Sequence, residues 1–149
     1  MAKIAIVRVK GLFGVKPAVK TTLASLRLHR LNHCVVFEDS PSLRGMIQVA
    51  KDYICWGAVK DETLRAVTEK RGNLLDKKRE LESTSQNVKS DAKGEKGKAE
   101  SKKPEKKTNN MLFALHAPRG GWNGTIKKRF PHGAAGPRDD IDALLIAMS

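Results

Sequence analysis

The sequence predicts a two-layer domain of mixed α and β structure, in which helices cover one face of a small sheet. Apolar β-branched runs and helical stripes alternate in the order β-α-β-α-β-α over about the first seventy residues, and each helix is long enough to return the chain across a sheet. The turn after the first strand carries neither a G-x-G-x-x-G nor a G-x-x-x-x-G-K-[ST] loop. Because these loops bind the phosphates of nucleotide cofactors, their absence argues against a doubly wound nucleotide-binding domain.

The first strand and helix have clear boundaries. Residues 4–9 are apolar and β-branched with Arg8 as the one polar interruption, and the Gly11–Gly14 turn ends the strand. Pro17 suits a first helical turn. The helix that follows buries one stripe, made of Val15, Val19, Leu23 and Leu26.

Two further strand-helix units follow. Residues 31–38 and 54–59 are predicted strands, and a helix near 43–53 is preceded by two candidate N-caps, Ser40 and Ser42. The inward stripe of that helix comprises Leu43, Ile47, Ala50 and Ile54. A third helix runs from Asp61 to Gly72, with acidic residues in its first turn and basic residues in its last, as the helix dipole favours.

The chain divides into three parts. Residues 1–75 form the predicted α/β domain. Residues 76–110 are a Lys-, Glu- and Ser-rich linker, whose 83–109 portion buries too little apolar surface to fold alone and is expected to be a mobile spacer or to order only on a partner. Residues 111–149 form a glycine-rich basic extension that ends in a short helix.

The extension has an unusual charge pattern. Residues 110–138 carry five Lys and Arg, no Asp or Glu, and five glycines, a composition that suits a peptide laid closely against phosphates. Asp139, Asp140 and Asp142 then open the last helix, where negative charge is stabilising, so they are predicted to cap it rather than to bind metal. The apolar face of this helix, with Ile141, Leu144, Leu145 and Met148, must dock either on the domain or on a partner.

The overall charge points to a polyanionic partner. The 149 residues include 29 Lys and Arg against 16 Asp and Glu, a net charge of +13. Such an excess repels itself unless a polyanion neutralises it, so nucleic acid is the first candidate and an anionic membrane surface the second. No run approaches the roughly 18 apolar residues of a membrane span, and the protein is expected in the cytoplasm.

The sequence shows no constellation for catalysis. Cys34 and Cys55 lack companions at ligand spacing and are predicted to be buried, and His33 and Cys34, adjacent in a strand, point to opposite faces. No catalytic, cofactor-binding or metal-binding residue and no small-molecule substrate is predicted.

Three amino-terminal stretches and one carboxy-terminal stretch resemble a known family. They are residues 28–35 (LHRLNHCV), 39–47 (DSPSLRGMI), 53–57 (YICWG) and 115–122 (LHAPRGGW), the last followed by Ile126-Lys127-Lys128 and Gly133-Ala134-Ala135-Gly136. In order and spacing they are similar to the large-subunit ribosomal protein "L thirty" family, in the long form found in archaea. The resemblance covers residues 3–75 and 112–149; between Asn73 and Asn110 the chain departs from the partly apolar helical sequence usual in relatives.

The resemblance implies an α+β fold with a small antiparallel sheet, similar to ferredoxin-like folds, and a structural role in the large ribosomal subunit. It also implies ribosomal RNA as partner, a position near the 5S ribosomal RNA, and neighbouring ribosomal proteins. The alternatives are a free-standing RNA-binding or RNA-chaperone protein and a small enzyme.

Basic residues on predicted turns, helix edges and the glycine-rich segment are the expected RNA contacts. They are Lys10, Lys16, Lys20, Arg27, Arg30, Arg44, Arg119, Lys127, Lys128 and Arg129. Trp122 has two open roles, as a platform for a base or as a buried anchor of the extension.

Overall fold

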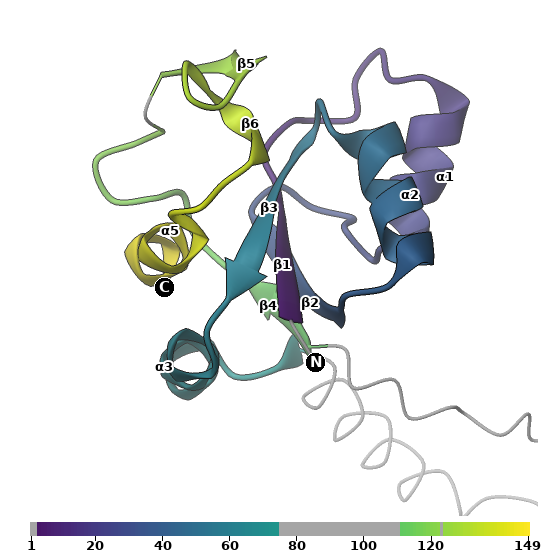
Figure 1. Cartoon of the computed structure of the whole chain (residues 1–149). Coiled ribbons are helices and arrows are strands. Elements are labelled where there is room, and N and C mark those ends of the chain that lie inside the picture. The colour runs from purple at the N-terminus through teal and green to yellow at the C-terminus, as the bar shows by residue number, and fades with distance from the viewer. Residues whose placement is uncertain (1–2, 75–110, 123) are drawn as a thin grey trace, which may run out of the picture.

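The computed structural model describes residues 3–74, 111–122 and 124–149, and within them it shows a six-stranded mixed sheet with helices (Figure 1). The strand order is β4-β2-β1-β3-β6-β5. The predicted linker at 76–110 lies outside the described residues. The elements in chain order are β1 (Lys3–Arg8), α1 (Pro17–Ser25), β2 (His33–Glu38), α2 (Pro41–Ala50), β3 (Ile54–Val59), α3 (Asp61–Arg71), β4 (Met111–Ala114), β5 (Thr125–Arg129), β6 (Gly133–Pro137) and α5 (Ile141–Met148).

The six predicted amino-terminal elements are confirmed, with ends that differ by a few residues. β1 is the central strand of this half and pairs antiparallel with both β2 and β3, so that Ile6 lies opposite Val35 on one side and Trp56 on the other. Ser40 is the N-cap of α2, because its hydroxyl accepts a hydrogen bond from the Leu43 N–H at 3.2 Å. The class predicted from sequence and resemblance, α+β with antiparallel pairing in this half, is confirmed.

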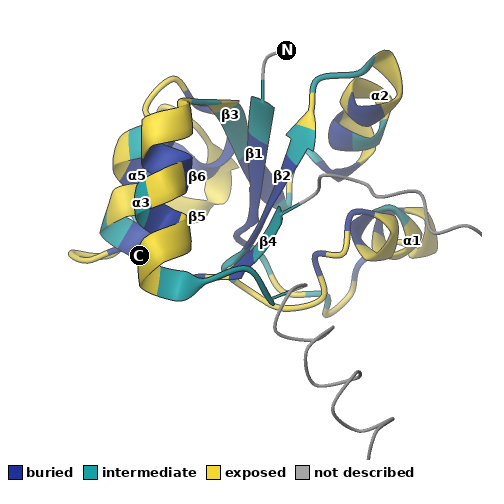
Figure 2. Cartoon of the chain, turned by 90° about the horizontal axis from the view of Figure 1, so that it is seen from below, coloured by how far each residue is buried: buried dark blue, intermediate teal, exposed yellow. Residues whose placement is uncertain are grey.

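The helices lie on both faces of the sheet, which corrects the expectation that they cover one face. Figure 2 shows the strands between α1 and α2 on one side and α3 and α5 on the other. The reason lies in β1, where Ile6 packs under α1 and α2 while Ala5 and Val7 pack under α3 and α5, all fully buried. A strand that is apolar on both faces needs cover on both.

The residues after the undescribed segment complete the sheet. β4 pairs antiparallel with β2, with Phe113 opposite Cys34, while β6 pairs parallel with β3 and β5 pairs parallel with β6. The sheet is therefore mixed, and the carboxy-terminal residues that we expected to form an extension are built into the same sheet.

Two glycines in this region allow backbone segments of the protein itself to approach closely. A Cβ on Gly57 in β3 would lie 2.2 Å from the carbonyl oxygen of Arg138, and one on Gly133 would lie 2.1 Å from that of Lys128. At both positions the missing side chain lets two backbone segments of the protein itself lie in contact.

The last helix docks on the domain itself. Ile141, Leu144, Leu145 and Met148 are all buried, in one apolar cluster with β1 residues and with Leu64 and Val67 of α3. The open question about its apolar face is settled in favour of the domain.

Candidate nucleic-acid interface

Several loops meet where β1 ends. The N–H groups of Val9 and Lys10 both donate to the Tyr53 carbonyl, at 2.9 and 3.2 Å, and the Asn32 N–H donates to the Arg8 carbonyl at 2.9 Å. The Lys10 ammonium lies 5.9 Å from the centre of the Tyr53 ring. These contacts join the turn after β1, the loop before β2 and the turn before β3.

Strand β5 adjoins the same place from the edge of the sheet. The Lys10 ammonium donates to the Lys127 carbonyl at 3.1 Å. All five residues of β5, Thr125–Arg129, are exposed, so Lys127 and Lys128 face solvent beside the turn that carries Lys10. Figure 1 shows β5 and β6 lying beyond the end of β1 that leads to α1.

We call this region the basic end of the sheet and define it as residues 10–16, 27–33, 52–53 and 125–129. These segments contain seven of the ten predicted contacts and a single carboxylate, that of Asp52. The seven are Lys10, Lys16, Arg27, Arg30, Lys127, Lys128 and Arg129. Lys20 is exposed on α1, one turn beyond Lys16. No Asp or Glu precedes Glu38 in the sequence, so the basic residues of the first two segments have no acidic neighbours in the chain.

Arg8 positions one of these segments from the inside. Its side chain is buried, and its guanidinium donates to the carbonyls of Lys10 (2.9 Å), Leu28 (3.0 Å) and His29 (2.7 Å). Burial lowers the pKa of Arg8. From the sequence, Arg8 was interpreted only as a polar interruption of the strand. A lone arginine between apolar neighbours could have indicated this role, because its guanidinium needs hydrogen-bond acceptors when the strand is buried.

Arg27 and Arg30 lie on the loop that Arg8 holds. Both are exposed, and Arg27 adopts a left-handed conformation with φ +60° as the chain leaves α1. His33 at the start of β2 lies near them. Burial lowers the pKa of His33, and the charges of Arg30, His29 and Arg8 lower it further.

Two of the predicted contacts are already ion-paired. The Arg129 guanidinium contacts a carboxylate oxygen of Asp52 at 2.6 and 2.9 Å. Arg44 holds Asp39 through two hydrogen bonds, one of them at 2.9 Å, and this pairing lowers the pKa of Asp39. Because Glu38, next to Asp39, pairs with Lys3 at the start of β1, Arg44 lies at the opposite end of the sheet from Lys10.

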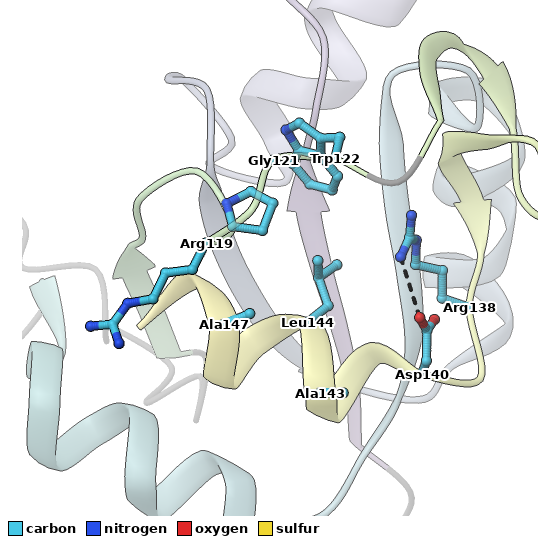
Figure 3. A pocket seen from close by; sticks show the side chains of 9 residues that line it. Arg119, Gly121, Trp122, Arg138, Asp140, Ala143, Leu144 and Ala147 are labelled. Atoms are coloured by element: carbon cyan, nitrogen blue, oxygen red, sulfur yellow. Dashed lines mark hydrogen bonds and ion pairs between the residues drawn. The ribbon is translucent and has the colours of Figure 1, made fainter.

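Arg119 lies on the other face of the sheet, beside α5. Its N–H donates to the Ala147 carbonyl at 3.1 Å. It lines a shallow cavity of about 170 Å³ with Trp122, and its side chain points away from Trp122 and Arg138 (Figure 3). The ten predicted residues therefore do not form one surface: Arg119 and Arg44 are apart from the basic end.

Trp122 packs against the apolar cluster under α5 and is half-buried. The guanidinium of Arg138 lies 5.9 Å from its ring centre and 5.2 Å from that of Phe130. Arg138 is buried, with the Asp140 carboxylate at 3.5 Å, and sequence analysis did not single it out. In this geometry Trp122 anchors residues 115–122 to the domain.

The acidic residues near α5 have structural partners. Asp140 is the N-cap position of the helix but makes no cap hydrogen bond with its side chain, which faces Arg138 instead. Asp142 accepts from the Lys60 N–H at 3.2 Å, which ties α5 to the start of α3. Among the described residues, no three His, Cys, Asp or Glu side chains are grouped as metal ligands.

Both thiols are buried and reduced, as predicted. Burial raises the pKa of Cys34 far above its usual value and that of Cys55 to about 12, so neither is an accessible thiolate nucleophile. In the part of the chain that the structure describes, no helix combines the length and the hydropathy needed to cross a bilayer.

Comparison with known proteins gives a consistent result. Residues 4–54 match the family model described as "Ribosomal protein L30p/L7e". The similar proteins include three relatives, each named "Large ribosomal subunit protein uL30". That of Methanothrix thermoacetophila is 48% identical over 75 residues, half of this chain and half of that protein. That of Methanocella arvoryzae is 37% identical over 139 residues (88% of each chain), and that of Archaeoglobus fulgidus 37% over 153 residues (97% of this chain, 98% of the relative).

Proposed function

This chain belongs to the uL30 family of ribosomal proteins, and we propose that it is a non-catalytic structural constituent of the large ribosomal subunit that binds and stabilises folded ribosomal RNA. The single observation that supports RNA binding best is the basic end of the sheet. There four segments from distant parts of the sequence lie at one end of the sheet, and together they carry seven Lys and Arg residues and one carboxylate.

The proposed mechanism is electrostatic. Lys10, Lys16, Lys127 and Lys128, with Lys20 on the adjoining helix, contact phosphates, while Arg27 and Arg30 do so from the loop that Arg8 holds. Such contacts recognise the shape of a folded RNA and its 2′-hydroxyls more than its base sequence. The loops are held by backbone hydrogen bonds, so the backbone loses little conformational entropy on binding, and the main ordering cost is that of the Lys and Arg side chains.

Three of the predicted contacts differ from the others because they are ion-paired or lie away from the basic end of the sheet. They are Arg129, Arg44 and Arg119. Arg129 lies at the basic end but has to exchange Asp52 for a phosphate. Arg44 and Arg119 lie elsewhere, so as RNA contacts each acts on its own, Arg44 after exchanging Asp39. Closeness to 5S ribosomal RNA, contacts with neighbouring ribosomal proteins and the cytoplasmic location are further proposals that rest on family membership.

Sedimentation of cell extract tests the ribosomal role. The protein is expected to travel with large subunits at moderate salt. Its presence in the light fractions, together with indiscriminate binding to unrelated RNAs, would favour the free-standing RNA chaperone.

The salt dependence of binding to purified ribosomal RNA tests the mechanism. With about six phosphate contacts, affinity is expected to fall on the order of a thousandfold between about 50 and 200 mM salt. Lys128→Ala is expected to reduce the slope of log affinity against log salt by about one unit. The matched control is Lys60→Ala. Lys60 is exposed and lies at the opposite end of the sheet, because its neighbour Val59 pairs with Lys3 at the start of β1. Equal slopes for the two variants would contradict the assignment of the basic end.

A further inference from the structure

Phe13 has the most exposed large apolar side chain in the described part of the structure. Its exposure is 105%, whereas the next large apolar side chains, Leu31 and Ile146, are each at 51%. An isolated exposed leucine or isoleucine is ordinary on a protein surface. Exposing a whole aromatic ring to water is unfavourable in free energy. The position of Phe13 therefore indicates a role in binding.

The loop holds Phe13 in this exposed position by anchoring the residues around it. Leu12 packs partly against the apolar cluster under α1 and α2, and Val15 is buried in the same cluster. Between them Gly14 adopts φ +67°, a left-handed conformation that turns the chain without a side-chain clash. Phe13 thus stands at the tip of a short turn that is fixed on both sides.

The surroundings of this ring are cationic. Lys10 and Lys16 lie three residues before and three residues after Phe13, in an amino-terminal stretch with no acidic residue before Glu38. Lys10 also contacts the Lys127 carbonyl, so β5 with Lys127 and Lys128 adjoins the same turn. An apolar protein partner would have to cover these cations without neutralising them, at a large desolvation cost. A nucleotide matches both features, because its base stacks on a ring while its phosphates pair with ammonium groups.

We propose that Phe13 stacks on an unpaired base of ribosomal RNA while Lys10 and Lys16 contact the phosphates beside that base. The inference rests on the proposed RNA-binding function and adds to it a single-stranded or bulged nucleotide as the element bound at this turn. Helical RNA offers phosphates but no open base face, so stacking of this kind distinguishes a loop or bulge from a regular duplex.

Affinity of the full chain for its own large-subunit ribosomal RNA, at one fixed salt concentration, tests the proposal. Phe13→Ala is expected to weaken binding roughly 5- to 150-fold, the effect of losing one base–aromatic stack. Phe13→Trp, which keeps an aromatic face, is expected to bind within a few-fold of the parent protein. Phe13→Leu, which keeps apolar bulk without a ring, is expected to resemble Phe13→Ala. Because no charge changes, all three variants should keep the parental salt slope.

Ile146→Ala is the matched control, since it removes an exposed apolar side chain from α5 on the other face of the sheet. Chemical probing of the bound RNA adds a direct readout: one base should be protected by the parent protein and by Phe13→Trp, and reactive with Phe13→Ala. If the parent protein binds and Phe13→Ala and Phe13→Leu both bind as tightly as the parent, stacking is wrong while the proposed function stands. If the parent protein itself does not bind ribosomal RNA, the proposed function fails. A photo-crosslink from position 13 to a ribosomal protein in place of RNA would also overturn the inference.

Discussion

The Lys10 ammonium donates a hydrogen bond to the backbone carbonyl of Lys127, 3.1 Å away and 117 residues later in the sequence. This contact joins the turn after the first strand to an exposed strand at the far edge of the sheet. The contact brings two basic segments that are separate in the sequence to one surface. At the same surface Asp52 forms an ion pair with Arg129 and so neutralises one of its positive charges.

Asp52→Ala is expected to tighten RNA binding roughly 2- to 5-fold. The Asp52–Arg129 pair is about half exposed, and an exposed pair is worth only about 0.2–1 kcal/mol, so its removal releases Arg129 for a phosphate at little structural cost. Filter binding at low salt measures the change. Glu62→Ala, which removes an exposed carboxylate from the first turn of α3, serves as the control and should leave affinity unchanged; unchanged affinity for Asp52→Ala would contradict the prediction.

Gly57→Ala and Gly45→Ala are expected to change stability in opposite directions. An added methyl group on Gly57 would lie 2.2 Å from the Arg138 carbonyl, so the chain leading into α5 must move, at a cost of about 1–3 kcal/mol or more. Gly45 lies inside α2 with nothing within 4 Å of its added Cβ, and alanine there should stabilise by about 0.5–1 kcal/mol. Urea unfolding gives both values. Equal effects of the two substitutions would show that the close approach at Gly57 is not real.

Leu145→Ala is expected to lower the free energy of unfolding by about 2–5 kcal/mol, because Leu145 is almost fully buried in the cluster shared with β1 and α3. Its neighbour Ile146 is half exposed, and Ile146→Ala should change stability by less than about 0.5 kcal/mol. If the two substitutions have equally small effects on thermal unfolding, the last helix does not contribute to the core.

Stability is expected to fall as pH falls below about 6.5, in part through His33. The pKa of His33 is lower in the folded protein than the value of about 6.5 in the unfolded chain, so the unfolded state binds more protons in this range and acid favours it. Unfolding free energies at about pH 7.5 and 5.5 measure the effect. His33→Gln should reduce the difference between the two values. An undiminished difference in His33→Gln would assign the effect to other groups.

Local pattern was sufficient for the amino-terminal half. The stripe of Val15, Val19, Leu23 and Leu26 and the Ser40 cap depend on residues a few positions apart, and the structure contains both. The burial of Cys34 and Cys55 followed from the absence of chemical companions.

The basic segments of the proposed interface were predicted from charge and turn residues alone. Their assembly was not, because it depends on contacts such as Lys10 to Lys127 that span most of the sequence. The neutralisation of Arg44 by Asp39 depends on side-chain geometry, which charge counting does not include. Phe13 escaped notice because a phenylalanine between two glycines predicts a turn but not the direction of its ring.

The sequence by itself determined the alternation of strands and helices, the aliphatic core and the cationic character of this protein, since each follows from spacing or composition within short windows. Only the tertiary structure decided that helices cover both faces of the sheet, that residues 111–137 supply three of its strands, and that Gly57 and Gly133 serve internal backbone contacts. Strand pairing across a long separation depends on which edges and faces remain uncovered once the local elements have formed. That is a property of the assembled surface and not of any one segment.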